Sequence, residues 1–184
     1  SPVLNETQLA QIQVEEPQTA HLSTLFEIST GPEGLEAAVR RLCEEATLLV
    51  RSGKKILVLS DAIAHASPGS ISAEYTYIPP LLAVGAVHHH LIREGLRMRT
   101  SLVVHTSQCW STHHFACLLG YGANAICPYL ALETVRHWWS SSKTQGLMER
   151  GKLPKTTLSG AQKNYCKAVE DGLLKILSKM GISL

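Results

Sequence analysis

Three short apolar runs constrain the fold of this chain more than any other feature. They are ILVLS at 56–60, SLVVH at 101–105 and NAIC at 124–127. Each run is too short for an ordinary helix, and its continuous apolar character is typical of parallel strands that are buried on both faces. Residues 30–53 and 79–95 lie before and between these runs and repeat apolar side chains at helical spacing.

This alternation of helices and strands predicts an α/β domain with a mostly parallel sheet flanked by helices. A strand-like run at 25–28 adds a fourth candidate strand. Three or four strands are too few to close an eight-stranded barrel, so we expect an open or partial barrel-like sheet. Residues 111–120 predict a short helix, and residues 129–184 are helical in pattern with a break near 151–154.

Local signals place the ends of several elements. Thr30 with Glu33, and Ser159 with Gln162, have the spacing of a capping box at a helix start. Residues 62–77 contain the Ser, Pro and Gly typical of loops and are predicted to be a loop. The residues before Leu25 are predicted to be a polar entry segment.

Charge and cysteine content exclude several functional classes. Seventeen Lys and Arg against 15 Asp and Glu leave a nearly balanced chain, so we expect no nucleic acid and no membrane surface as a partner. No apolar run reaches the roughly 18 to 20 residues of a membrane span. An odd number of cysteines without a CxxC pair predicts reduced thiols in an intracellular protein. The chain lacks an initiator Met, so we expect it to be a piece of a longer polypeptide.

Histidines gather in the middle of the chain but lack the spacing of a helical metal site. His88, His89 and His90 are adjacent. Adjacent residues on a helix point about 100° apart, whereas a helical zinc site needs ligands at i and i+4. We therefore interpret these histidines as buried or interfacial polar groups. His88 shares a stripe with the apolar positions and is expected to face the core.

A second histidine pair, His113 and His114, follows Ser111 and Thr112 at a predicted helix start. One of the two could cap the helix or line a polar cavity. Pairing with Cys109 or Cys117 as a nucleophile is the alternative, but the apolar surroundings lack a cation that would lower the pKa of a thiol.

Polar residues end the predicted strands. Asp61, His105 and Cys127 should lie side by side, because parallel strands present their carboxyl ends at one edge, where α/β folds bind ligands. We predict a polar rim of Asp61, His105, His113 and His114. The alternative is that Asp61 caps the following loop or pairs with a Lys or Arg. The glycines of GYGANA precede a strand and do not form a dinucleotide-binding motif. No complete catalytic, cofactor or metal site is predicted.

Longer stretches of the chain resemble the central region of glutamate synthase. The resemblance rests on GPEGLEAAVRRLCEEA, LLAVGAVHHHLIREGLRMRTSLVV, CWSTHHFACLLGYGANAICPYLALETVR and NYCKAVEDGLLKILSKMGIS. The segment QCWSTHHFACLLGYGA is most similar to the ferredoxin-dependent type of cyanobacteria and plastids. The resemblance covers nearly the whole chain.

The resemblance implies a place in a multidomain iron-sulfur flavoprotein. Such an enzyme hydrolyses glutamine in a glutaminase domain, passes ammonia through a tunnel, and forms glutamate from 2-oxoglutarate at FMN. Electrons arrive from ferredoxin through a 3Fe-4S cluster. By resemblance, residues 1–155 belong to the later part of the central domain and residues 156–184 begin the FMN-binding domain. The family's cofactor contacts have no counterpart in this chain. The implied location is the bacterial cytoplasm or the plastid stroma.

Two departures from the family pattern fall on the predicted rim. An arginine is expected after Ser60 and Asp61, but Ala62 stands there, followed by a longer loop, and His105 stands where an acidic residue is expected. The ion pair expected at this edge is therefore in question.

The sequence leaves two functional hypotheses. In the first, the chain is a connecting domain that also walls the ammonia tunnel and is inactive alone. In the second, it is an independent His-dependent metalloenzyme that uses Asp61, His105 and His113 or His114.

Overall fold

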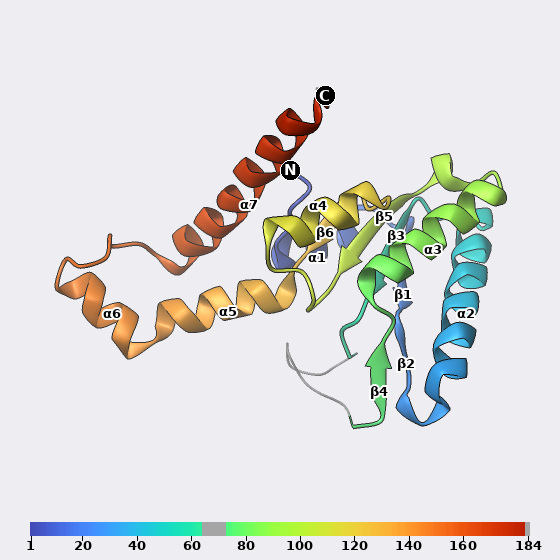
Figure 1. Cartoon of the computed structure of the whole chain (residues 1–184), viewed down its shortest axis with the longest axis horizontal. Coiled ribbons are helices and arrows are strands. Elements are labelled where there is room, and N and C mark those ends of the chain that lie inside the picture. The colour runs from blue at the N-terminus through green and yellow to red at the C-terminus, as the bar shows by residue number, and fades with distance from the viewer. Residues whose placement is uncertain (64–72, 183–184) are drawn as a thin grey trace.

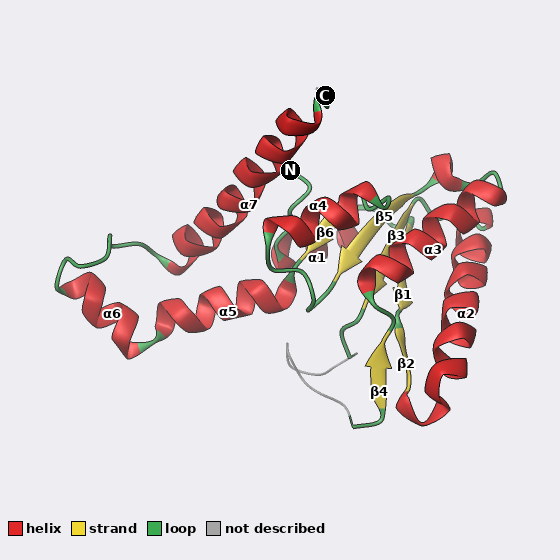
Figure 2. Cartoon of the chain, viewed as in Figure 1, coloured by secondary structure: helices red, strands yellow, loops and turns green. Residues whose placement is uncertain are grey.

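The structure, a computed structural model, describes residues 1–63 and 73–182 of the chain (Figures 1 and 2). Helices and short strands alternate along most of its length. The strands are β1 (Thr19–Ser23), β2 (Leu25–Glu27), β3 (Ile56–Ser60), β4 (Tyr75–Tyr77), β5 (Ser101–His105) and β6 (Ala125–Cys127). The helices are α1 (Glu6–Glu15), α2 (Gly31–Arg51), α3 (Pro80–Arg93), α4 (Thr112–Gly120), α5 (Tyr129–Ser140), α6 (Ser142–Glu149) and α7 (Leu158–Met180), with 3-10 turns η1 (Ile28–Thr30) and η2 (Arg97–Arg99).

The central element is a four-stranded sheet in the order β1-β3-β5-β6. All three strand pairs are parallel. Their register aligns Ser60 with His105, and His105 with Cys127, at the carboxyl edge. The predicted α/β class with a mostly parallel sheet is confirmed. A separate antiparallel pair, β2 with β4, lies below the sheet in Figure 1.

The two faces of the sheet bury different clusters, because successive side chains of a strand point to opposite faces. The larger cluster joins Leu57, Leu59 and Val104 with apolar side chains of α2, α3 and α4. On the other face, Val58 and Val103 pack with Leu9 of α1. The runs at 56–60 and 101–105 therefore form the two central strands, β3 and β5, with helices on both faces, whereas the run at 124–127 forms β6 at the end of the sheet.

The last three helices form an arm beside this body (Figure 1). Helix α5 leaves the end of β6, α6 turns at its far end, and α7 returns to pack against α5 and α4. The break predicted near 151–154 is confirmed, since residues 150–157 lie between α6 and α7. Within the described residues, no helix has the continuous apolar length that a membrane crossing requires.

Several local predictions are wrong. The polar entry segment before Leu25, for which no helix or strand is predicted, forms α1 and β1. Helix α1 buries only Leu9, so its sequence shows little repetition of apolar residues at helical spacing. The sequence signal for this helix is the capping box of Asn5 and Gln8. The predicted loop 62–77 contains β4, whose three residues YTY pair with β2. The rest of that loop, including the extra length predicted after Ala62, lies mostly outside the described residues.

Both predicted capping boxes are also wrong. The Thr30 hydroxyl donates to the Glu27 carbonyl at 2.5 Å within the 3-10 turn that precedes α2, so it does not cap that helix. Helix α7 begins earlier than the signal at Ser159 suggests, because Thr157 accepts the Gly160 amide at 3.1 Å. Two residues with capping-box spacing form the capping hydrogen bonds only where the first of them has an extended backbone and stands just before the helix.

Candidate functional site

Asp61 lies at the carboxyl end of β3 and is almost fully buried, with 7% of its surface exposed. Its carboxylate accepts hydrogen bonds from the Thr106 hydroxyl at 2.5 Å and the Tyr129 hydroxyl at 2.8 Å. The Ser107 amide donates at 3.1 Å to each carboxylate oxygen. These donors come from the loop after β5 and from the start of α5. Asp61 thus joins three elements at the carboxyl edge of the sheet.

Among the described residues, the hydrogen-bond partners of Asp61 are all uncharged groups. Within residues 1–63 and 73–182, the ion pairs of Lys and Arg involve other carboxylates, so the alternative of a Lys or Arg partner receives no support. The Asp61 carboxylate accepts hydrogen bonds from the hydroxyls of Thr106, Ser107 and Tyr129, where the family pattern leads us to expect an ion pair with a cation. The sequence does carry a signal for them: Thr106 and Ser107 follow β5 directly, and Tyr129 follows the proline that ends β6.

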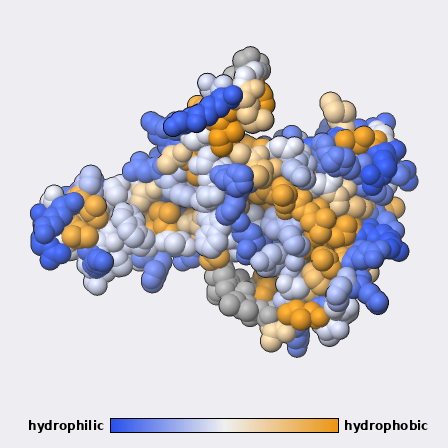
Figure 3. All heavy atoms as spheres, in the orientation of Figure 1, coloured by the Kyte–Doolittle hydropathy of each residue, from blue (hydrophilic) through white to orange (hydrophobic). Residues whose placement is uncertain are grey.

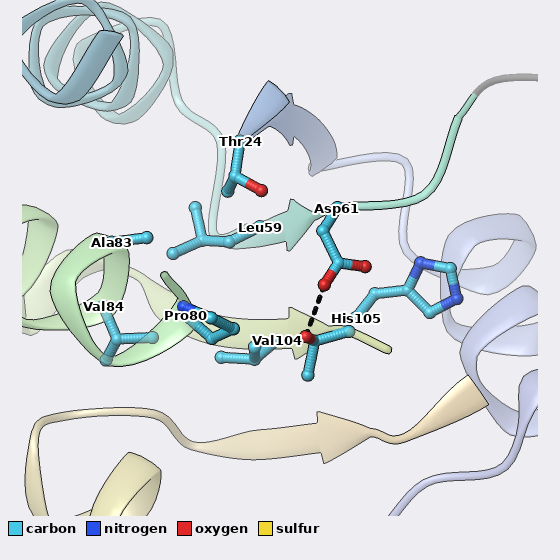
Figure 4. A pocket seen from close by; sticks show the side chains of 9 residues that line it. Thr24, Leu59, Asp61, Pro80, Ala83, Val84, Val104 and His105 are labelled. Carbon is cyan, nitrogen blue, oxygen red and sulfur yellow. Dashed lines mark hydrogen bonds between the residues drawn. The ribbon is translucent and has the colours of Figure 1, made fainter. Parts of the chain in front are cut away.

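His105 ends β5 beside Asp61, but its ring points away from that carboxylate (Figure 4). The His105 Nδ1 and Ser60 Oγ share a hydrogen bond of 2.9 Å, and the imidazole lies against the Tyr129 ring with centroids 4.6 Å apart. Burial lowers the pKa of His105; Asp61 opposes this shift and His21 adds to it. His105 is therefore a neutral polar group packed at the sheet edge near neutral pH.

The cavity beside these residues is small. Thr24, Leu59, Pro80 and Val104 line it together with Asp61 and other side chains of the edge (Figure 4). Its volume of about 10 Å³ is about the room that one water molecule needs. An organic substrate does not fit in this space.

His113 and His114 lie on α4, and their hydrogen-bonding partners belong to the same region of the chain. The His114 Nδ1 accepts the Trp110 amide at 3.4 Å, and the His113 Nε2 lies 3.5 Å from the Cys117 Sγ. No hydrogen bond links either histidine to Asp61 or His105 among the described residues. The structure therefore brings Asp61 and His105 to one edge and leaves His113 and His114 with other partners.

The thiols of Cys109 and Cys127 are shielded from solvent. Burial raises the pKa of Cys109 to about 12 and that of Cys127 to about 12. A thiol that stays protonated is a poor nucleophile and a poor metal ligand. Within the described residues, no group of three or more His, Cys, Asp and Glu side chains is arranged to hold a metal ion.

The central histidines are structural groups. His88 is half-buried and does not belong to the apolar core, and its Nδ1 accepts a hydrogen bond from the Arg97 Nε at 2.9 Å. The His90 Nε2 and Thr47 Oγ1 lie 3.0 Å apart and join α3 to α2. The His89 Nδ1 contacts the Gly85 carbonyl at 2.8 Å.

Acidification is expected to destabilise the domain through three of its histidines. Burial lowers the pKa of His21, of His88 and of His105 from the ordinary value of 6.5. As pH falls below about 6.5, the unfolded chain binds protons at these positions before the folded chain does, so the free energy of unfolding decreases. The loss ends once pH passes the folded values. Urea unfolding at pH 7.5, 6.5 and 5.5 measures this slope.

A His105→Gln variant is the control, because glutamine does not titrate. It should show a shallower decrease between pH 7 and pH 5.5 than the parent chain. An unchanged slope in this variant would mean that His105 does not contribute to the pH dependence.

The comparisons of this chain with known proteins all indicate the same family. The family model of the glutamate synthase central domain matches residues 1–184. Ferredoxin-dependent glutamate synthases of Pyropia yezoensis and of Synechocystis are 56% and 55% identical over the whole chain. The chloroplastic enzyme of Spinacia oleracea is 58% identical, also over the whole chain. The chain spans only 11 to 12% of the length of these relatives.

Proposed function

Because the chain belongs to the glutamate synthase central domain family, we propose that it is the connecting domain of a ferredoxin-dependent glutamate synthase. The observation that carries this proposal is the match of the whole chain, residues 1–184, to relatives with that name. The whole enzyme would convert glutamine and 2-oxoglutarate to glutamate with electrons from ferredoxin. This domain would link the glutaminase and FMN domains and wall part of the ammonia tunnel.

The side chains of the domain support a scaffolding role. Asp61, the most buried carboxylate at the ligand-binding edge of the sheet, has its acceptor positions taken by neighbouring donors. The cavity beside it has room for about one water molecule. The Asp61 carboxylate therefore fastens β3, β5 and α5 together and is not free to attack or protonate a substrate.

An apolar groove between α2 and α3 supports contact with a neighbouring domain. Pro32, Leu35, Val39 and Leu82 line this groove together with the ion pair of Glu36 and Arg40, and its volume is about 430 Å³. Figure 3 shows apolar colour gathered over the side of α3 that faces α2. Exposed apolar patches of this kind mark interaction surfaces. The neighbouring domains of the same polypeptide are the partners that we propose for it.

The cofactors of the whole enzyme, FMN and a 3Fe-4S cluster, are proposed to be held by other domains. A cluster of this kind is ligated by Cys thiolates. Here Cys43, Cys109 and Cys127 are buried and Cys117 and Cys166 half-buried, and no three of the described Cys, His or acidic residues are grouped as ligands. The donor set does not fit a cluster, so no step of electron transfer is assigned to these residues.

Two finer proposals concern the boundaries and the location. By resemblance, residues 156–184 would begin the FMN-binding domain; in the structure α7 packs against α4 and α5 of the same body. The relatives include cyanobacterial and chloroplastic enzymes. We therefore propose the bacterial cytoplasm or the plastid stroma as the location.

The test compares this chain with a complete synthase that contains it. The 184-residue chain alone is expected to form no glutamate from glutamine or from ammonia. In the complete enzyme, Leu82→Glu places a charge in the groove and is expected to raise the glutamine hydrolysed per glutamate formed, because removing a carboxylate from water weakens a domain contact. Leu82 is 44% exposed, so the domain itself tolerates the charge.

Leu48→Glu is the matched control, since Leu48 is 66% exposed on α2 and does not line the groove. Equal ratios in the two variants would remove the groove as a domain contact. Turnover by the chain alone would contradict the scaffolding role. The metalloenzyme alternative is tested by elemental analysis of untagged protein, and a metal content below about 0.1 per chain excludes it.

A further inference from the structure

Two metal-binding side chains lie one helical turn apart on α4. His113 and Cys117 are four residues apart, so both point to the same side of the helix. The His113 Nε2 is 3.5 Å from the Cys117 Sγ, while its Nδ1 is 4.0 Å away. His113 is exposed and Cys117 is half-buried. An ion from solvent can therefore reach both atoms.

The distance between these two atoms matches a tetrahedral chelate. Zinc bonds to sulfur at about 2.3 Å and to imidazole nitrogen at about 2.0 Å, and a tetrahedral angle between the bonds places N and S about 3.5 Å apart. We propose that His113 and Cys117 form a two-ligand site for zinc or a chemically similar divalent ion. The proposal is independent of the function proposed for the whole enzyme.

The other thiols and histidines of the region do not compete for this role. Cys43, Cys109 and Cys127 are buried, and burial raises the pKa of each of them. Burial also raises the pKa of Cys166. The His114 ring centroid is 6.5 Å from that of His113, and its Nδ1 accepts the Trp110 amide. The ion would therefore have two protein ligands, with water in the remaining positions.

Binding at this site has a defined proton balance. The Cys117 thiol loses its proton when sulfur bonds to the metal, and the His113 Nε2 must be unprotonated to donate its lone pair. One proton is released per ion from a neutral imidazole and a thiol. The apparent affinity should therefore rise with pH. Because the ion bridges residues one turn apart, its binding should also stabilise α4.

Cobalt(II) is the probe, since a thiolate bound to cobalt gives a charge-transfer band in the near ultraviolet. The untagged, reduced 184-residue chain is titrated with cobalt(II) and then with zinc, which should displace it. We expect a thiolate band that saturates at one ion per chain. Cys117→Ser should abolish the band, and His113→Ala should weaken the apparent affinity about tenfold or more, because even the loss of a group that only orients a metal ligand costs about 10- to 100-fold.

His114→Ala is the matched control and should bind cobalt as the parent does. Zinc should also protect Cys117 of the unmodified chain from iodoacetamide, as measured by peptide mass spectrometry, so the proposal does not rest on variants alone. Absence of a thiolate band, its survival in Cys117→Ser, unchanged affinity in His113→Ala, or no protection of Cys117 would each overturn the proposal.

Discussion

Replacing Asp61 with alanine is expected to lower the free energy of unfolding by about 3 kcal/mol. The carboxylate accepts hydrogen bonds from Thr106, Ser107 and Tyr129 in a nearly solvent-free position. Alanine leaves these donors buried without an acceptor, and each unsatisfied buried donor costs about 1 to 3 kcal/mol. Only part of this cost is expected to appear, because water can enter the space left behind. Urea unfolding monitored by circular dichroism measures the change.

Two conservative variants separate the hydrogen bonds from the rest of the side chain. Asp61→Asn keeps the shape and one acceptor oxygen, so it should lose about half as much stability as alanine. Tyr129→Phe removes one donor and leaves the carboxylate with its other partners, so its loss should be about 1 kcal/mol. If Asp61→Ala unfolds at the same urea concentration as the parent, the carboxylate does not fasten this edge.

The buried strands and the helices between them could be predicted because their signal is local. The apolar runs at 56–60 and 101–105 are continuous, and α2 repeats apolar residues at helical spacing. Helix α1 and strand β1 were missed for a physical reason. They cover the second face of the sheet and its edge, where few side chains are buried, so their sequence is mostly polar. Their formation depends on the sheet that they pack against.

The candidate site could be predicted only in part. The alignment of Asp61, His105 and Cys127 follows from the parallel register alone. Side-chain direction does not follow from register in the same way. Asp61 turns toward Thr106 and Tyr129, whereas His105 turns toward Ser60. The i, i+4 spacing of helical metal ligands excludes the adjacent histidines, whereas His113 and Cys117, the pair that we propose as metal ligands, have this spacing but are of two residue types.

A different junction, between the end of α3 and the turn before β6, depends on Arg97. Its Nε donates to the His88 Nδ1 at 2.9 Å, and its other nitrogens donate to the Thr100 carbonyl at 2.7 Å and the Gly122 carbonyl at 2.8 Å. The Asn124 Oδ1 accepts from Arg97 at 3.2 Å and from the Leu102 amide at 2.9 Å. One guanidinium thus joins α3, β5 and the turn after α4.

Gly122→Ala is expected to break this junction and to lower the free energy of unfolding by about 3 kcal/mol. Gly122 has a φ of +116°, a conformation that costs an alanine about 1 to 3 kcal/mol. Its new Cβ would also lie 2.3 Å from the His88 Nδ1 and 2.6 Å from the His88 Cγ. The ring cannot move away without giving up its hydrogen bond to Arg97. Urea unfolding at pH 7.5 measures the loss.

Gly120→Ala supplies the matched control, because a Cβ at Gly120 meets no atom within 4 Å and the residue ends α4 without a left-handed φ. Its stability should equal or slightly exceed that of the parent, since alanine loses less backbone entropy on folding. The clash and the backbone strain at Gly122 can then be separated with His88→Ala. In that background no ring opposes the new Cβ, so Gly122→Ala should cost only the backbone strain, and the difference between the two costs measures the contact with His88. An equal cost in both backgrounds would show that the ring does not limit this position.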